Sequence, residues 1–237
     1  KDVTDLKNKI KTEFNIEGNP SKNFLKLVRS NKPTQVTLVP DGLNDITSNK
    51  GWDTIKNESF LKDCIQELKE LRIRTSIFVD PNLKMIDGAK RIGSDRVELY
   101  TKSYADIFLK NPDEAISAFV KSSKHAQNIN IGINAGHDLN LKNIEFFSES
   151  IPNLKEVSIG HALICESLYF GIENTVKALD GVFMFTIYDE TNDILYAGRD
   201  PMGVRPGFIS KDENGTFISS EAKSLINASK ISNCLLQ

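Results

Sequence analysis

The chain has 237 residues, of which 39% are hydrophobic, and its 30 basic and 32 acidic side chains give a formal net charge of −2. This balance argues against nucleic acid and anionic membranes as partners, because both attract proteins with an excess of basic residues. The sequence has no signal peptide and no apolar run near the ~18 residues of a membrane-spanning helix, so we expect a cytoplasmic protein.

The cysteines and the glycines limit the possible bound groups. Cys64, Cys165 and Cys234 are scattered and form no CxxC pair, which is typical of a reducing compartment and predicts neither a disulfide framework nor a zinc site. No nicotinamide-binding or P-loop glycine pattern is present, and we expect no metal and no cofactor. The chain opens without Met, in a predicted helix, so we expect its first residue to be a cut edge.

Short apolar runs alternate with amphipathic segments along most of the chain. After a helix over 1–12, the pattern predicts six strand–helix units. Each strand is apolar through its middle, as expected for a parallel sheet buried under helices. The predicted strands are 14–20, 35–40, 74–81, 95–101, 129–136 and 156–161. The predicted helices are 24–28, 60–71, 83–92, 112–127, 143–150 and 165–179.

The spacing of these units predicts an α/β fold. Strand starts recur about every 20–40 residues, which suits a TIM-type (β/α) barrel, and a doubly wound open sheet is the alternative. We favour the barrel, incomplete at its N-terminus, because polar residues occur where the strands end. In a barrel those ends meet at one mouth. These residues are Glu17, Thr47, Asp80, Glu98, His137 and His161.

The pattern changes after residue 179, where short strands follow one another through turns instead of helices. Strands are predicted at 180–189, 194–198, 207–210 and 216–219, which together indicate a small antiparallel β-meander. A meander does not continue a series of strand–helix units. We therefore predict two domains, 1–179 and 180–237.

His137 comes directly after Ala135-Gly136, where a buried strand opens into a loop. Imidazole has an unperturbed pKa near neutrality, so a histidine at this place is suited to acid–base chemistry. The alternative is a histidine that only caps the strand through hydrogen bonds. A polar loop over 41–53, which contains Thr47, is long enough to act as a lid over such a site.

A series of stretches in residues 1–179 resembles the pyridoxine 5'-phosphate synthase family. The family's reaction condenses 3-amino-2-oxopropyl phosphate with 1-deoxy-D-xylulose 5-phosphate through general acid–base steps. The resemblance implies small phosphorylated substrates and a homo-oligomer. The family's first two strand–helix units have no counterpart in the matched region. The matching stretches are 14–17, 36–40, 45–48, 76–81, 97–101, 134–137 and 159–162.

The same resemblance implies roles for particular residues. Glu17 and His137 correspond to the family's acid–base groups, and Glu98 corresponds to a carboxylate that stabilises cationic intermediates; a structural ion pair is the alternative for Glu98. Asp138 departs from the glycine expected after the histidine, and its carboxylate could repel a phosphate. The positions that correspond to substrate or phosphate contacts are Thr47, Asp138, Gly160 and His161.

Stretches 179–183, 198–206 and 220–225 resemble the glutaminase domain of asparagine synthetases. That family's nucleophile is an amino-terminal cysteine, which has no counterpart in the matched stretches. The sequence thus leaves three interpretations: a synthase of the pyridoxine 5'-phosphate type, a catalytically inactive chimera or fragment of two enzymes, and, least favoured, a glutamine amidotransferase.

Overall fold

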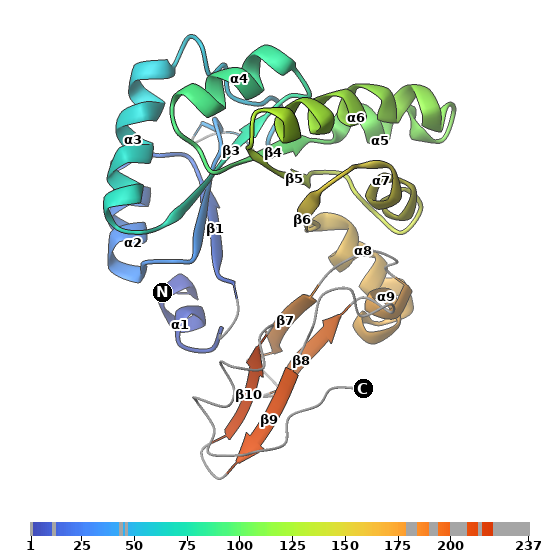
Figure 1. The fold of residues 1–237 in the computed structure, drawn as a ribbon. Coiled ribbons are helices and arrows are strands. Elements are labelled where there is room, and N and C mark those ends of the chain that lie inside the picture. Colours follow the sequence, from blue (N-terminus) through green and yellow to red (C-terminus); the bar gives the residue numbers. More distant parts are fainter. Residues whose placement is uncertain are drawn as a thin grey trace.

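The computed structural model describes residues 2–10, 13–42, 45 and 47–178, and four C-terminal strands at 184–189, 194–199, 208–212 and 215–219. Six parallel strands form one sheet in chain order, and the sheet curls into a half-barrel with helices on its outer face (Figure 1). The predicted incomplete TIM-type barrel is therefore confirmed. The strands are β1 (Asn15–Gly18), β2 (Gln35–Leu38), β3 (Arg74–Val79), β4 (Arg96–Tyr100), β5 (Gly132–Gly136) and β6 (Leu154–Ser158).

The helices follow the predicted order with three differences. The first helix is shorter than predicted, and the short helix α5 was not predicted. The single helix predicted over 165–179 is two helices, because Gly171 takes a left-handed conformation (φ 77°) and breaks it. The helices are α1 (Asp2–Lys7), α2 (Lys22–Asn31), α3 (Glu58–Glu70), α4 (Leu83–Arg91), α5 (Lys102–Phe108), α6 (Pro112–Asn128), α7 (Ile144–Ser150), α8 (His161–Phe170) and α9 (Ile172–Ala178).

The hydrophobic core lies between the sheet and the helices. Alternate strand residues, such as Val36, Ile77 and Leu99, are fully buried against the helical layer. Tyr104 of α5 packs its ring against Phe119 of α6 and Phe147 of α7, with centroids 6.0 and 4.9 Å away. These rings join the helices that follow β4 and β5, and so hold the loops at one end of the sheet in place.

The other face of the sheet is polar near the amino ends of the strands. Glu156 of β6 forms an ion pair with Arg96 (2.8 Å) and accepts hydrogen bonds from Asn134 (2.7 Å) and Gln35 (3.0 Å). Arg74 donates to Gln35 (2.7 Å) and also pairs with Glu13. This interior network, which we define as Glu13, Gln35, Arg74, Arg96, Asn134 and Glu156, joins five strands, β2 to β6, by side-chain contacts.

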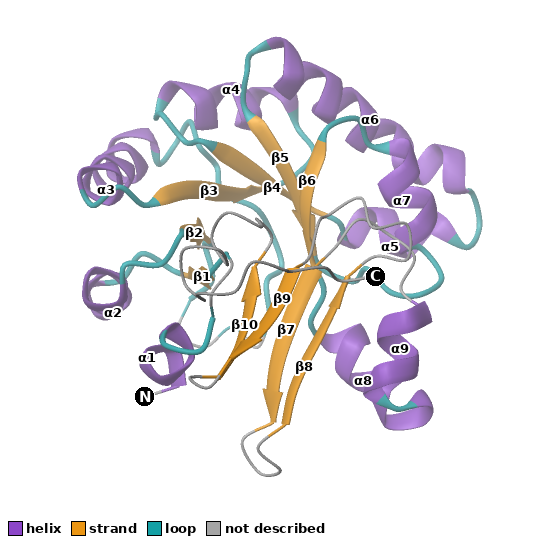
Figure 2. Ribbon diagram, turned by 60° about the horizontal axis from the view of Figure 1, so that its bottom comes forward, coloured by secondary structure: helices purple, strands orange, loops and turns teal. Residues whose placement is uncertain are grey.

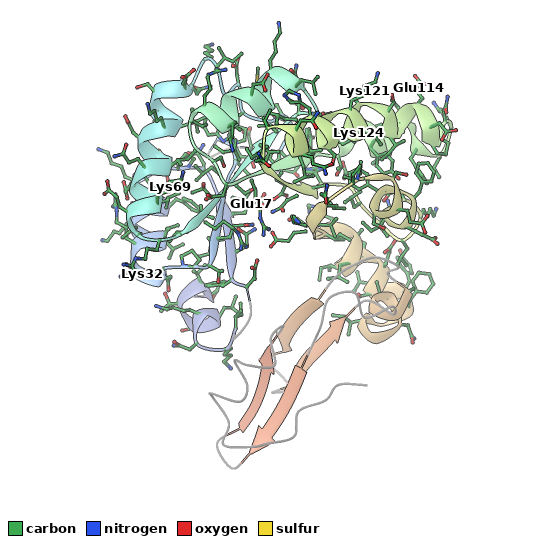
Figure 3. All side chains as sticks on the ribbon, in the orientation of Figure 1. Glu17, Lys32, Lys69, Glu114, Lys121 and Lys124 are labelled. Atoms are coloured by element: carbon green, nitrogen blue, oxygen red, sulfur yellow. The ribbon has the colours of Figure 1, made fainter. Side chains whose placement is uncertain are left out.

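Charged side chains also cover the outside of the helical layer. In Figure 3, Lys32, Lys69, Lys121 and Lys124 point outward, whereas Glu17 points toward the space that the sheet encloses. Within the described part of the chain, no helix is both long and apolar enough to cross a membrane.

The C-terminal strands form two antiparallel pairs, β7 (Met184–Asp189) with β8 (Ile194–Arg199), and β9 (Phe208–Asp212) with β10 (Gly215–Ser219). The described strands thus pair as two hairpins, and they match the four strands predicted from the sequence. Both lie on the open side of the half-barrel, between α1 and α8 (Figures 1 and 2). Neither joins the six-stranded sheet, so β1 and β6 are its edge strands among the described elements.

Candidate functional site

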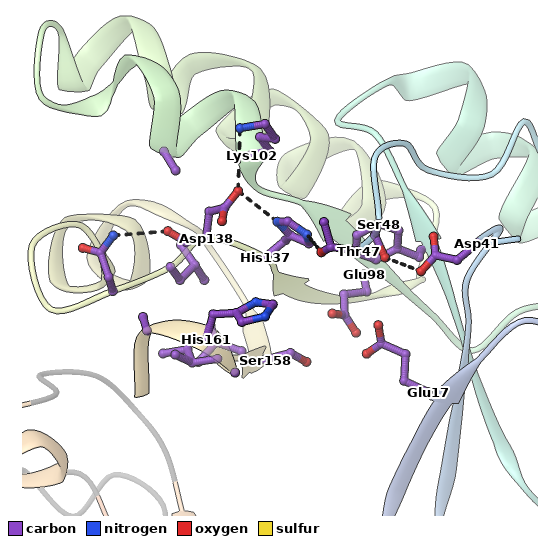
Figure 4. A pocket seen from close by; sticks show the side chains of 18 of the residues that line it. Glu17, Asp41, Thr47, Ser48, Glu98, Lys102, His137, Asp138, Ser158 and His161 are labelled. Carbon is purple, nitrogen blue, oxygen red and sulfur yellow. Dashed lines mark hydrogen bonds and ion pairs between the residues drawn. The ribbon is translucent and has the colours of Figure 1, made fainter. Parts of the chain in front are cut away.

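A cavity of about 810 Å³ opens at the carboxyl ends of the parallel strands (Figure 4). Parallel strands place their carboxyl ends along one edge of the sheet, and in barrels this edge forms the mouth. Every site residue named from the sequence lines this cavity. These residues are Glu17, Thr47, Glu98, His137, Asp138, Gly160 and His161.

Asp80 is the one strand-end residue of the sequence analysis that does not line this cavity. Its carboxylate instead accepts a hydrogen bond from the backbone N–H of Gly51 (3.2 Å). A Cβ at Gly51 would lie 2.3 Å from the backbone nitrogen of Asp80, so only glycine allows this close approach. Asp80 therefore holds the end of the 41–53 loop against β3.

Glu98 is buried at the centre of the site, with 1% of its surface exposed. Burial, and then the charge of Glu17, raise the pKa of Glu98 to about 8, although hydrogen bonds from Ser158 and Thr37 oppose the shift. No cation pairs with Glu98 among the described residues, so the structure does not contain the alternative ion pair. At neutral pH this carboxyl group is largely protonated and can donate a proton.

Glu17 extends from β1 toward Glu98, as Figure 4 shows. Solvent reaches Glu17 from the cavity, yet the protein packed around its carboxyl group raises its pKa, and the charge of Asp41 raises it further. Asp41 is held in turn by the Ser48 hydroxyl, which donates to it at 2.6 Å. Two interacting carboxyl groups whose pKa values are both raised hold their protons more tightly than usual, which suits general acid–base chemistry.

His137 follows β5 in a left-handed conformation (φ 90°), which turns its side chain into the cavity. Its Nε2 lies 2.8 Å from the Thr47 hydroxyl and its Nδ1 lies 2.9 Å from the Asp138 carboxylate. The ring also meets Tyr100 edge to face, with centroids 4.9 Å apart. Since both ring nitrogens contact side chains, His137 does not cap the backbone of its strand.

The loop that carries Thr47 is anchored on one side. Trp52 donates its indole N–H to the carbonyl of Leu38 (3.1 Å) and its backbone N–H to the carbonyl of Phe78 (2.8 Å). The Tyr100 hydroxyl donates to the carbonyl of Ser48 (3.0 Å). These bonds tie the loop from Ser48 onward to the sheet beside the cavity.

The opposite wall of the cavity is the start of α8. The strand predicted over 156–161 ends earlier, at Ser158, and Gly160 is the N-cap of the helix. Among the described residues, no side chain caps α8 and no atom lies within 4 Å of a Cβ built on Gly160. The first amide groups of α8 are therefore available to an anion, beside the exposed His161.

Sequence reasoning missed several residues that line the cavity, namely Asp41, Lys102, Asp106 and Ser158. Lys102 and Asp106 lie on α5, which has too short an apolar pattern to be recognised. Among the described lining residues, Lys102 is the single lysine or arginine. The described residues contain no group of three or more side chains that could hold a metal ion.

The fold and the site together define a (β/α)-barrel protein with carboxyl and imidazole groups converging at the mouth of the barrel. A family model described as "Pyridoxal phosphate biosynthesis protein PdxJ" matches residues 1–183. The chain belongs to this family.

Curated relatives agree with the family match. The chain is 56% identical over 176 residues to the pyridoxine 5'-phosphate synthase of Flavobacterium johnsoniae, and the alignment covers 74% of each chain. It is 55% identical to the enzyme of that name from Christiangramia forsetii and 53% identical to the one from Cytophaga hutchinsonii, with the same coverage.

A second family model, described as "Glutamine amidotransferase domain", matches residues 161–235. The resemblance noted from the sequence is thus found independently, and the match begins upstream of it, at the start of α8. The two family matches overlap over 161–183.

Proposed function

We propose that this chain acts as a pyridoxine 5'-phosphate synthase, which condenses 3-amino-2-oxopropyl phosphate with 1-deoxy-D-xylulose 5-phosphate in vitamin B6 biosynthesis. The observation that carries the proposal is the convergence of Glu17, Glu98 and His137 on one cavity. The 56% identity to a relative of that name supports the choice of substrates. Imine formation, dehydration and ring closure are successive proton transfers, and they need several acids and bases close together.

The proposed roles follow from the environment of each group. Glu98, whose pKa is raised to about 8, donates a proton or a hydrogen bond, and Glu17 accepts protons beside it. His137 protonates leaving oxygens through Nε2, the ring nitrogen that faces Thr47 and the cavity. Closure of the Thr47 loop excludes water from the imine intermediates.

The proposed phosphate sites use helix geometry and hydroxyl groups. The uncapped start of α8, with Gly160 and His161, suits one phosphate, since backbone N–H groups and the helix dipole favour an anion there. The Thr47 hydroxyl suits the other. Asp138 would contact a phosphate through its backbone N–H, because its carboxylate repels an anion.

The organisation into a barrel segment over 1–179 and a separate segment over 180–237 is part of this proposal. It is supported by the two hairpins, which pair within themselves and not with the six-stranded sheet in the described part of the chain. The amidotransferase match supports a different origin for the second segment.

The test is to incubate the 237-residue chain with both phosphates and to follow the formation of pyridoxine 5'-phosphate. We expect product that His137→Ala and Glu17→Gln remove. The matched control is His125→Ala, because His125 lies on α6 and pairs with Asp87 (2.6 Å), away from the cavity. Absence of product from a folded chain that still binds both phosphates would support the inactive chimera instead.

A further inference from the structure

The two ring nitrogens of His137 have partners of different character. An ionised carboxylate only accepts hydrogen bonds, so the contact between Nδ1 and Asp138 Oδ2 (2.9 Å) requires a proton on Nδ1. A hydroxyl group can donate or accept, so the contact between Nε2 and Thr47 (2.8 Å) is compatible with either state of Nε2. In the neutral ring, Nε2 is then the free base that faces the cavity.

The backbone brings the carboxylate to the ring of the preceding residue. His137 and Asp138 are both left-handed, with φ values of 90° and 57°. The Thr101 hydroxyl, with its single proton, contacts both the carbonyl oxygen of Gly136 (2.7 Å) and that of His137. Left-handed backbone is accessible to glycine, asparagine and aspartate at little cost, so residue 138 belongs to the small group of residue types that fit.

Lys102 lies near this carboxylate. Its Nζ lies 4.0 Å from Asp138 Oδ2 and 3.0 Å from Asp106 Oδ1 (Figure 4 draws the first contact). A bare carboxylate at the mouth would oppose substrates that carry phosphate groups. The lysine on α5 is shared between the carboxylates of Asp138 and Asp106, so it offsets part of the negative charge beside His137.

We propose that Asp138 is a positioning residue for His137, which keeps the proton on Nδ1 and so directs Nε2 toward Thr47 and the substrate. The proposal rests on the proposed acid–base role of His137, in which Nε2, unprotonated in the neutral ring, takes up a proton before it protonates a leaving oxygen. Through this bond the imidazole ring has one tautomer and one orientation before substrate binds. Every proton that His137 exchanges with the substrate then passes through Nε2.

Two variants at one position separate the contributions of backbone and side chain. Asp138→Gly keeps the left-handed backbone and removes the acceptor, whereas Asp138→Asn keeps both the backbone and an acceptor oxygen for Nδ1–H. Nitrogen-15 spectra of histidine-labelled protein report the tautomer of each of the three histidines, and His137→Ala assigns the signals. We expect Nδ1–H in the original chain and in Asp138→Asn, and a mixture of tautomers in Asp138→Gly.

Kinetics provide the second readout. Loss of a hydrogen bond to a charged acceptor predicts a kcat about tenfold lower in Asp138→Gly, with KM for both phosphates unchanged, and recovery of most of this loss in Asp138→Asn. A tautomer that is the same in Asp138→Gly, or a loss confined to KM, would overturn the proposal. The spectra need no substrate, so a chain that forms no product contradicts the proposed function while the tautomer still tests the pairing.

Discussion

The carboxyl group of Glu98 lies against Gly136 of the neighbouring strand, in space that a side chain at position 136 would fill. A Cβ at Gly136 would lie 2.3 Å from Glu98 Oε1 and 3.0 Å from the Cβ of Ser158. Gly136, which ends β5, thus leaves room for the buried carboxyl group of Glu98 on the adjacent strand β4.

This relationship predicts the effect of Gly136→Ala. The added methyl group must displace Glu98 in a packed interior, so we expect the free energy of unfolding to fall by about 1–3 kcal/mol and product formation to fall with it. Gly160→Ala is the control for stability, because a Cβ there meets no atom of the described residues within 4 Å. Urea titration and the product assay measure both effects. Equal stability of the two variants would contradict the prediction.

The raised pKa of Glu98 predicts a particular pH dependence of stability. A carboxyl group with a pKa of about 8 in the folded chain and a usual value of 4.5 binds its proton more tightly when folded. Its contribution to stability is therefore complete at low pH and is lost as the pH rises through about 8. We expect Glu98→Gln to flatten the fall in the free energy of unfolding between about pH 5 and about pH 8, by more than about 1 kcal/mol. If the free energy of unfolding of the variant falls with pH as steeply as that of the original chain, the pKa of Glu98 is not raised by folding.

Two arginine substitutions, one inside the interior network and one outside it, are predicted to differ in how much stability they cost. Arg74→Met removes a guanidinium with 25% of its side chain exposed, which contacts Glu13, Gln35 and Glu156, and we expect a loss of about 1–3 kcal/mol in the free energy of unfolding. Arg29→Met removes a pair with Glu67 in which the arginine is 50% exposed, and should cost less than about 1 kcal/mol.

Arg74→Met should also change how the stability of the protein depends on pH in the acidic range. Hydrogen bonding to Arg74 is the main cause that lowers the pKa of Glu13 to about 2. A lowered pKa gives stability that is present above the usual value of 4.5 and is lost as the pH falls toward about 2. We expect Arg74→Met to remove this loss. Denaturation profiles at acidic pH measure it, and an unchanged acid transition would rule out this role of the pair.

Because the described sheet has two edge strands, we predict that added strand–helix units can complete the barrel. Eight parallel strands close a barrel of this type, and the described sheet has six, with edges at β1 and β6. Beside β6, α8 exposes Leu168 (81%) and Tyr169 (86%), an apolar surface suited to a further strand–helix unit. We expect product formation to rise at least about tenfold when the part of the Flavobacterium johnsoniae synthase outside the matched region is added.

A shuffled version of that added segment is the control, and it should leave the rate unchanged. Protection of β1 and β6 amides from hydrogen exchange gives a readout that is independent of turnover. If neither the rate nor the protection changes, the two edges are not a docking surface for such strands.

The alternation of strands and helices could be predicted from the sequence because it follows from local patterns, and the residues predicted for the site line one cavity. Buried strands are recognisable from apolar runs, and residues directly after them, such as His137, must lie at one edge of a parallel sheet. The left-handed backbone at His137 and Asp138 could not be predicted, since neither residue requires it. The contact of Nδ1 with Asp138 depends on that backbone.

The long-range side-chain contacts could not be predicted from the sequence either. Arg74 and Glu156 are separated by several strand–helix units, and no local pattern indicates that they meet. Helix α5 was missed for a different reason. Its seven residues stabilise the fold mainly through the burial of Tyr104, which is a tertiary contact and not a periodic signal.

The polar inner face has a consequence for how an open sheet behaves in water. Barrel interiors are commonly filled with layers of valine, isoleucine and leucine. An unclosed sheet with such an interior would expose a large apolar surface to which other chains could bind. Here Gln35, Arg74, Arg96 and Glu156 occupy the inner face near the amino ends of the strands. Such a face can be hydrated at low cost, so we expect its exposure to promote aggregation less than an apolar interior would.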